Sequence, residues 1–404
     1  MKRFLAFILA FLMILCVFSA CGSSKDDESE NNDAEQEEEQ KEEETPEDSA
    51  ENKENNENSN PSDGGDGEDG DQSEDGSGDE GGNELEMRPE DYYTIDGNKI
   101  TFGSYPQTLV TDAGLIAQLN TGAGNLPNAE NAENWNSYGY YISGRNDTDF
   151  MWYIDVSVEN DKYRGVYFVS YRPYVTSYGT DSNYAKDGFE TGKIYWFKYE
   201  PLTWTILRKD DTEGTALILC DMIIDSQAYQ NNYQSGGSNH IDGEAEGPYV
   251  NNYECSTIRA WLNAEFYNTA FSTSEQSLVR DTMVDNSGAT TNSPTNPYAS
   301  ENTDDKVFLL SLQDTINTEY GFSSSKATND TVRVKKFTDY ARVQGIYEFS
   351  DQTYAGKSCW WLRSPSDTDP TKSCVVMYTG DSNNGCYVNS TNYGVVPALR
   401  IKLK

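Results

Sequence analysis

The apolar residues of this 404-residue chain fall into two regions that are separated by a long polar stretch. An apolar run, Phe4–Phe18, follows Lys2 and Arg3, and almost no further apolar residue occurs before Leu85. From residue 89 onward, short runs rich in aromatic and β-branched residues alternate with Asn, Asp, Gly and Ser, as in strands joined by turns. The pattern predicts a short N-terminal segment, a linker and one domain over residues 89–404.

Strands dominate the predicted domain. The segment 381–385 lies between two of them and predicts a hairpin, because Asn and Gly tolerate positive φ. The predicted strands are 99–105, 149–156, 162–171, 193–199, 203–207, 216–224, 307–311, 359–362, 374–378, 386–389 and 396–403.

Helices are few, and local end signals mark them. Ser256 or Thr257 can cap a helix whose apolar side carries Ile258, Trp261, Leu262 and Phe266. Ser272–Glu275 has the form of a capping box, which predicts a helix through Leu278 and Val279. Two shorter helices, 311–319 and 338–344, end near Gly321 and Gly345. Strands, then grouped helices, then strands again favour an α+β domain with antiparallel sheets over βαβ repeats.

The N-terminal segment is an export signal by its pattern, since two basic residues precede an apolar run and small residues follow it. Phe18-Ser19-Ala20-Cys21 resembles the lipobox of bacterial lipoproteins, although Phe18 stands where Leu is commoner. The resemblance implies removal of residues 1–20 and diacylation of Cys21, which can carry palmitate. Two acyl chains suffice for a stable membrane anchor. An ordinary secretory signal cut after Ala20 is the alternative.

Residues 21–88 are predicted to be a disordered linker after the lipidated cysteine. From Ser24 to Arg88 there are 28 acidic and 4 basic residues, a net charge of −24 out of −38 for the chain. Such a segment cannot bury enough apolar surface to offset its ordering entropy. Asp and Gly recur between Asp63 and Gly82, so calcium binding is an alternative, but their spacing fits no EF-hand. We expect a solvated spacer.

The remaining residues carry 24 basic and 40 acidic side chains, a net charge of −16. No overall field therefore favours a nucleic acid, and we expect none as a partner.

Six segments between Ile100 and Leu403 carry a family resemblance. They are FGSYPQ (102–107), WFKYEPLTW (196–204), TIRAWLN (257–263), DKVFLLS (305–311), WWLRSP (360–365) and GVVPAL (394–399). With them the chain resembles a bacterial domain family of unknown function found in cell-surface lipoproteins, which brings no activity with it. The order of the late elements is also similar to C-type-lectin-like domains and the related formylglycine-generating-enzyme fold. That second resemblance implies that the first and last strands pair.

Catalytic motifs are scarce. His240 is the single histidine and lies in a Gly/Ser/Asn-rich loop, so we interpret it as an exposed loop residue rather than part of a triad. No Cys-x-x-Cys pair occurs, which argues against zinc ribbons and redox sites, and we expect no metal. Formylglycine-generating enzymes use a late cysteine pair to handle copper and oxygen. By that resemblance, the same chemistry is an alternative role for Cys359, Cys374 and Cys386. We expect the domain cysteines to be buried thiols or to form disulfides whose pairing the sequence leaves open. They are Cys220, Cys255, Cys359, Cys374 and Cys386.

The densest local signal is Trp360-Trp361-Leu362-Arg363-Ser364-Pro365. In a strand, Trp360 and Trp361 point to opposite faces, so we expect one in the core and the other toward a pocket or a neighbouring loop. Arg363 can pair with a buried carboxylate or meet an anionic ligand. These three residues are the candidate ligand-binding residues from sequence.

A second aromatic group supports a binding surface, because flat rings stack on sugars and peptides. Core packing is the alternative for these rings. The group consists of Tyr138, Tyr140, Tyr141, Trp152, Tyr153, Tyr171, Tyr174, Tyr178 and Tyr184.

Together these patterns predict a lipoprotein on the outer face of the bacterial cytoplasmic membrane, displaying a glycan- or protein-binding domain on an acidic linker. The alternatives are an extracytoplasmic enzyme on a formylglycine-generating-enzyme-like scaffold and a non-catalytic structural envelope protein. No cofactor is indicated.

Overall fold

The structure is a computed structural model of the whole chain. By its contacts the chain divides into Met1–Glu80 and Gly81–Lys404, and all described residues belong to the second unit. The predicted signal peptide, Cys21 and the acidic linker therefore lie outside the described residues, and the predicted boundaries at 20 and 88 stay predictions. The structure describes residues 91–127, 132, 134–138, 151–168, 189–231, 233, 238–349, 352–382 and 384–403.

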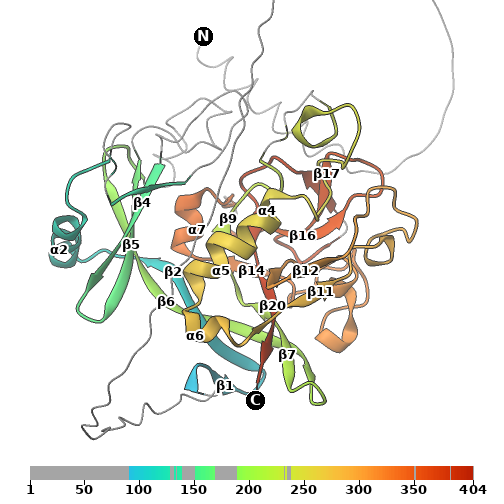
Figure 1. Cartoon of the computed structure of the whole chain (residues 1–404), viewed down its shortest axis with the longest axis horizontal. Helices are drawn as coiled ribbons and strands as arrows, with labels where there is room; N and C mark the ends of the chain where they lie inside the picture. Colours follow the sequence, from blue (N-terminus) through green and yellow to red (C-terminus); the bar gives the residue numbers. More distant parts are fainter. Residues whose placement is uncertain are drawn as a thin grey trace, which may run out of the picture. The chain divides into compact units, whose positions relative to one another are not determined.

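A ten-stranded sheet is the main element, and its path runs β10-β20-β7-β6-β5-β4-β3 (Figure 1). β2 pairs with β1 and β6, and β13 pairs with β20, so every pair in this sheet is antiparallel. Its strands are β1 (Thr94–Asp96), β2 (Lys99–Leu109), β3 (Asn136–Ser137), β4 (Met151–Val158), β5 (Asp161–Phe168), β6 (Ile194–Asp210), β7 (Thr215–Cys220), β10 (Val279–Arg280), β13 (Val307–Phe308) and β20 (Ala398–Lys402).

The long strand β6 corrects one prediction, because the sequence suggested two strands with a break at Glu200–Leu202. In the structure Glu200 pairs with Tyr105 and Pro201 pairs with Ser104, so the ladder with β2 continues through the break. The register of β2 shifts between Thr101 and Ser104, and a proline is tolerated at such an irregularity.

Three smaller sheets complete the domain. The five-stranded sheet has the order β18-β17-β16-β19-β9, and its β17–β18 pair confirms the predicted hairpin. The turn lies earlier than predicted, because Asn384 and Gly385 already pair with Val375 and Cys374. These sheets contain β9 (Asp225–Ser226), β16 (Trp360–Pro365), β17 (Lys372–Val376), β18 (Asn384–Tyr387) and β19 (Gly394–Val395); β8 (Met222–Ile223), β14 (Lys335–Phe337) and β15 (Lys357–Ser358); and β11 (Thr282–Val284) with β12 (Thr303–Asp305).

The helices begin and end largely where the sequence signals stand. Ser256 caps the first of the grouped helices by accepting from Arg259 N, and Ser272 forms the predicted capping box with Glu275. Thr338 caps α7, which ends at Gly345 in the left-handed conformation. The helices are α2 (Ala113–Ala123), α4 (Thr257–Trp261), the π-helical η4 (Leu262–Phe266), α5 (Tyr267–Ala270), α6 (Thr273–Gln276) and α7 (Asp339–Gln344), with 3₁₀ turns η3 (Ile241–Gly243), η5 (Gly288–Thr290), η6 (Asp314–Ile316), η7 (Thr318–Tyr320) and η8 (Gln352–Tyr354).

Two predicted helices are shorter than expected. The helix after Ser272 ends at Gln276, because Val279 enters β10 and pairs with Ile401. The segment 311–319 contains only the 3₁₀ turns η6 and η7. The sequence interpretation missed α2, which Asp112 caps. Among the described residues, none of the helices is long and apolar enough to cross a bilayer.

The predicted α+β class is confirmed, since the sheets are mostly antiparallel and the helices few. The pairing implied by the lectin-like resemblance is different, because β2 pairs with β1 and β6 whereas β20 pairs with β7, β10 and β13. Most buried apolar side chains form one core that includes Trp204, Trp360 and Trp361. A smaller cluster under α2 contains Trp196, whose ring lies against Gly165.

Candidate functional site

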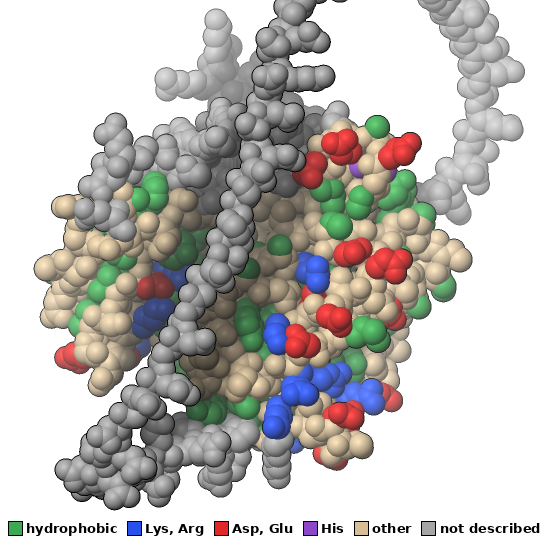
Figure 2. Space-filling view, viewed as in Figure 1, with side chains coloured by type: hydrophobic (Ala, Val, Ile, Leu, Met, Phe, Trp, Pro, Cys, Tyr) green, Lys and Arg blue, Asp and Glu red, His purple; other side chains and the backbone are tan. Residues whose placement is uncertain are grey.

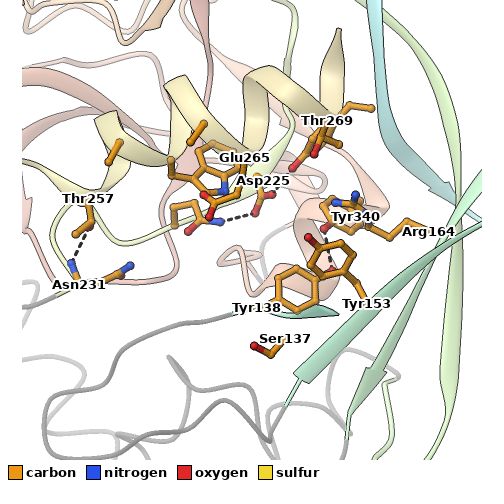
Figure 3. A pocket seen from close by; sticks show the side chains of 15 residues that line it. Ser137, Tyr138, Tyr153, Arg164, Asp225, Asn231, Thr257, Glu265, Thr269 and Tyr340 are labelled. Carbon is orange, nitrogen blue, oxygen red and sulfur yellow. Dashed lines mark hydrogen bonds between the residues drawn. The ribbon is translucent and has the colours of Figure 1, made fainter. Parts of the chain in front are cut away.

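A cavity of about 310 Å³ lies between the main sheet and the helices α4, η4, α5 and α7 (Figure 3). Six of its lining side chains are tyrosine, tryptophan or arginine, and two are acidic. The lining consists of Tyr105, Ser137, Tyr138, Tyr153, Arg164, Asp225, Gln227, Asn231, Thr257, Ala260, Trp261, Ala264, Glu265, Thr269 and Tyr340.

The sheet side of the cavity holds a buried cation. Arg164 of β5 is 5% exposed and donates from Nε and Nη2 to the two carboxylate oxygens of Asp155 at 2.8 and 2.9 Å. Its guanidinium carbon lies 4.3 Å from the centre of the Tyr153 ring, a cation–π distance. Tyr199 donates to Asp155 at 2.9 Å. Arg164 and Tyr199 thus hold the pKa of Asp155 below its usual range, although its burial opposes this. Asp155, the carboxylate partner of Arg164, is thus not one of the residues that line the cavity.

The helix side contains the π turn η4. On this side of the cavity, the lining residues Thr257, Trp261, Glu265 and Thr269 are spaced four residues apart. This spacing is wider than the 3.6 residues of an α-helical turn. A π turn holds more residues than an α turn, so it keeps this row facing the cavity. Such π turns occur often at functional sites.

Asp225 of β9 is a buried acid, with 2% of its surface exposed. Its carboxylate accepts from Tyr105 Oη at 2.9 Å, Gln227 Nε2 at 3.2 Å and the Ser226 backbone N at 2.7 Å. Desolvation disfavours the charged form more strongly than these three donors favour it. Burial therefore raises the pKa of Asp225 to about 7.

Glu265 is the second acid, and it stands on the π turn. Burial of part of its surface raises the pKa of Glu265 above the usual range. In the described part of the chain, no other side chain forms an ion pair or hydrogen bond with its carboxylate. Arg164 pairs with Asp155, which it shares with Lys162, so the lining itself contains two acidic side chains and one basic side chain.

The tyrosines are held in place by one another. The Tyr340 ring of α7 meets the Tyr105 ring edge-on at 5.6 Å, and the Tyr340 and Tyr138 hydroxyls lie 2.9 Å apart. The Tyr138 and Tyr153 ring centres are 4.8 Å apart. Asp339 fixes α7 to β2 by accepting from Leu109 N at 3.0 Å. The rings therefore form an ordered aromatic wall.

Neither predicted tryptophan lines this cavity. Trp360 and Trp361 are both completely buried, so neither ring faces this pocket. Trp360 Nε1 donates to the Arg333 carbonyl at 3.0 Å, and Trp361 Nε1 donates to the Gln227 carbonyl at 2.9 Å. Both faces of the sheet are covered at β16. Although the two rings point to opposite faces, neither ring is therefore exposed.

Arg363 is also a structural residue in this arrangement. Its Nη1 atom donates to Asp314 at 2.7 Å and to the Leu309 carbonyl at 2.8 Å, and it is 6% exposed. Arg363 thus pairs with a half-buried carboxylate, which corresponds to one of its two predicted roles.

The remaining predicted chemistry lies elsewhere. The ring of His240 stacks on Tyr249 at 4.5 Å, in a loop outside the cavity lining. The five domain cysteines are free thiols, and none lines the cavity. Burial raises the pKa of Cys220, Cys359 and Cys374 to about 12, so these thiols are poor nucleophiles. No group of three or more His, Cys, Asp or Glu side chains among the described residues could hold a metal ion.

The second aromatic group contributes part of the site. Tyr138 and Tyr153 line the cavity, whereas Trp152 packs in the smaller core cluster. The other members, Tyr140, Tyr141, Tyr171, Tyr174, Tyr178 and Tyr184, lie outside the described residues. Sequence reasoning missed Arg164, Asp225 and Glu265, because single charged residues in strands and helices give no local signal of convergence.

The described residues thus define an α+β domain with a tyrosine-walled, acidic cavity. Over residues 213–403 the chain contains a domain that matches a family described as "Domain of unknown function (DUF6273)". This confirms the predicted domain of unknown function over a shorter span than Ile100–Leu403. No curated protein and no solved structure matches the chain. The matched span supplies Asp225, Glu265 and Tyr340, whereas Tyr105 and Arg164 precede it, so both parts build the cavity.

Proposed function

We propose that this domain binds a hydroxyl-rich ligand, a sugar ring of a glycan, in the tyrosine-walled cavity. The observation that carries the proposal is the convergence of five aromatic side chains with carboxyl, amide and hydroxyl groups in one hollow. Aromatic rings stack on the apolar faces of sugars, while the polar groups accept and donate hydrogen bonds to hydroxyls.

The size and charge of the cavity narrow the ligand class. Its volume of about 310 Å³ is at the lower end of the range for ligand sites, which suits a single ring rather than a large aromatic cofactor. Asp225 and Glu265 line the cavity, and Arg164 is paired with Asp155, which it shares with Lys162. The lining thus combines two acidic side chains with one paired cation, and we take the proposed sugar to be neutral or to carry an amine.

The direct test is calorimetric titration with a panel of neutral and amino oligosaccharides. Trp261→Ala removes a half-buried ring from the cavity and should weaken binding by about 30-fold, as expected for an aromatic hot spot worth about 2 kcal/mol. Tyr387→Ala removes an exposed ring outside the lining and is the matched control. Equal binding by wild type and Trp261→Ala, or no binding to any sugar of the panel, would overturn the proposal.

The cellular setting is part of the proposal. The domain would stand outside the cytoplasmic membrane, anchored through diacylated Cys21 by the acidic linker. The support is the lipobox-like sequence and the net charge of −24 between Ser24 and Arg88. Incorporation of labelled palmitate in wild type, and its loss in Cys21→Ser, would support the anchor; labelling that persists in Cys21→Ser would contradict it.

A second candidate function is acid–base catalysis on the same ligand. Its specific support is that Asp225 and Glu265 share one cavity and both have raised pKa values, as catalytic acids often do. Glycoside hydrolysis is the reaction that paired carboxyl groups suggest. Release of reducing ends by wild type but not by Asp225→Asn would establish it, and binding without release would leave recognition as the function.

A further inference from the structure

Three polar groups of the cavity lining have no hydrogen-bond partner on another side chain of the described chain. They are the carboxylate of Glu265, the hydroxyl of Thr269 and the hydroxyl of Tyr153. Glu265 stands on η4 and Thr269 on α5, while Tyr153 comes from β4 on the other side of the cavity (Figure 3). We call these three residues the acceptor group.

The members of the acceptor group act on one place in the cavity. Glu265 and Thr269 are four residues apart on one helical segment, which makes their side chains neighbours. Burial is the main reason why the pKa of Tyr153 is raised, and the charge of Glu265 adds to this effect. The Glu265 carboxylate therefore lies within electrostatic reach of the Tyr153 hydroxyl.

The two acids of the lining differ in their availability. Asp225 is 2% exposed and already accepts from Tyr105, Gln227 and the backbone of Ser226. Glu265 is exposed, so a ligand in the cavity can reach its carboxylate. Glu265 is thus the acid that can pair with a ligand.

The protein does not supply the cation for this pair. Arg164, the basic residue of the lining, donates twice to Asp155 and lies 4.3 Å from the centre of the Tyr153 ring. Lys162, which also pairs with Asp155, is outside the lining. Figure 2 shows basic and acidic side chains next to one another over β4 and β5, as these ion pairs require. A cation for Glu265 has to come from the ligand.

A primary ammonium group fits the acceptor group by its chemistry. It carries three donors and no acceptor, and the carboxylate and the two hydroxyls can each accept one hydrogen bond. A ligand hydroxyl brings only one donor and no charge. Hydrogen bonds between charged partners are about twice as strong as neutral ones, and a cavity screens them less than open solvent does.

We propose that Glu265, Thr269 and Tyr153 bind the free primary amine of an amino sugar. The inference rests on the proposed function, sugar binding in this cavity, and narrows its ligand class. A sugar with a hydroxyl at the same carbon lacks the charge that Glu265 requires. An acetylated amine has lost both its charge and two of its three donors.

Three methyl glycosides that differ at a single carbon test the proposal on the full chain. They are methyl β-glucosaminide with a free amine, methyl β-glucoside with a hydroxyl, and methyl N-acetyl-β-glucosaminide. Calorimetric titration at about pH 6.5 keeps the amine protonated. A salt concentration of about 0.15 M screens its attraction to the acidic linker. The glucosaminide should bind about tenfold more tightly than either of the others, as expected for a hydrogen bond between charged groups.

Variants assign this preference to the acceptor group. Glu265→Gln keeps the shape of the side chain and should abolish the preference for the amine. Thr269→Val removes one acceptor and should reduce the preference about threefold. Glu246→Gln makes the same change in charge at an exposed glutamate outside the lining, and it should keep the preference.

The comparison of glycosides on wild type does not depend on the folding of any variant. No binding of the glucosaminide, or equal binding of the three glycosides, would overturn the inference. A preference that persists in Glu265→Gln, or that is lost equally in Glu246→Gln, would also overturn it. The oligosaccharide titration decides the proposed function separately: sugar binding without a preference for the amine would leave that function standing.

Discussion

Tyr105 donates its hydroxyl hydrogen to Oδ2 of Asp225 at 2.9 Å, joining β2 to β9 across 120 residues of sequence. Both side chains are almost fully buried and both line the cavity. The hydrogen bond gives the buried carboxyl group a partner, yet burial still raises the pKa of Asp225 to about 7.

The first prediction concerns the pH dependence of stability. Between an unfolded-state pKa of about 4 and a folded-state pKa of about 7, the folded protein keeps a proton on Asp225 that the unfolded chain has lost. The stabilisation from this group is therefore full below pH 4 and is lost as the pH rises through 7. Asp225→Asn should reduce the fall in unfolding free energy between pH 5 and 8 by a few kcal/mol.

Urea denaturation at both pH values measures this difference. Asp161→Asn is the control, because Asp161 is exposed and Lys198 lowers its pKa. An undiminished fall between pH 5 and 8 in Asp225→Asn would show that another group is responsible.

The second prediction concerns the buried guanidinium. Asp155→Ala leaves the buried Arg164 without its bidentate partner. Because Asp155 is partly exposed and also pairs with Lys162, the loss of unfolding free energy should be clear but below the about 3–5 kcal/mol of a fully buried pair. Asp161→Ala removes the partner of Lys198 in an exposed pair of the same sheet and should change stability little. Equal effects of the two substitutions on the urea midpoint would mean that Arg164 finds another partner.

The third prediction concerns the approach of β19 to β8. A Cβ atom at Gly394 would lie 2.3 Å from Ile223 Cγ2, so Gly394→Ala should cost about 1–3 kcal/mol of unfolding free energy by overpacking. At Gly385 the nearest atom would be 3.5 Å away, and Gly385→Ala is the matched control. Thermal unfolding measures both variants. In an Ile223→Ala background, which lacks Cγ2, Gly394→Ala should cost less than in wild type, and an equal cost would assign the loss to the backbone.

The fourth prediction concerns the thiols. Cys255 is exposed, while Cys220, Cys359 and Cys374 are buried with pKa values raised to about 12. A disulfide reagent at pH 7.5 should label Cys255 in the folded protein and reach the three buried thiols only after denaturation. Cys255→Ser should remove the fastest phase and leave the slower reaction of the half-buried Cys386. Rapid labelling of Cys359 or Cys374 in that variant would favour an accessible thiol site.

Local signals allowed the helix ends and most strands to be predicted, since Ser256, Ser272 and Thr338 cap through contacts within a few residues. The cavity could not be predicted in this way, because its residues come from distant elements and no spacing reveals that Arg164 faces Asp225. The two tryptophans were misassigned for a related reason: alternation separates their faces, but only the tertiary structure decides that both faces are covered.

The π turn η4 also has a meaning for the opposite side of its helix. Ile258, Leu262, Phe266 and Ala270 are all buried and recur every fourth residue. In a regular α-helix each such step would drift by about 40° around the axis. The wider turn at η4 cancels this rotation and keeps the four buried side chains in line. Their packing in the core is therefore sufficient to account for the π turn. Each residue of the cavity wall, Thr257, Trp261, Glu265 and Thr269, directly precedes one of these core residues in the sequence. Deleting one residue from η4 would therefore misalign the cavity row and the core row together.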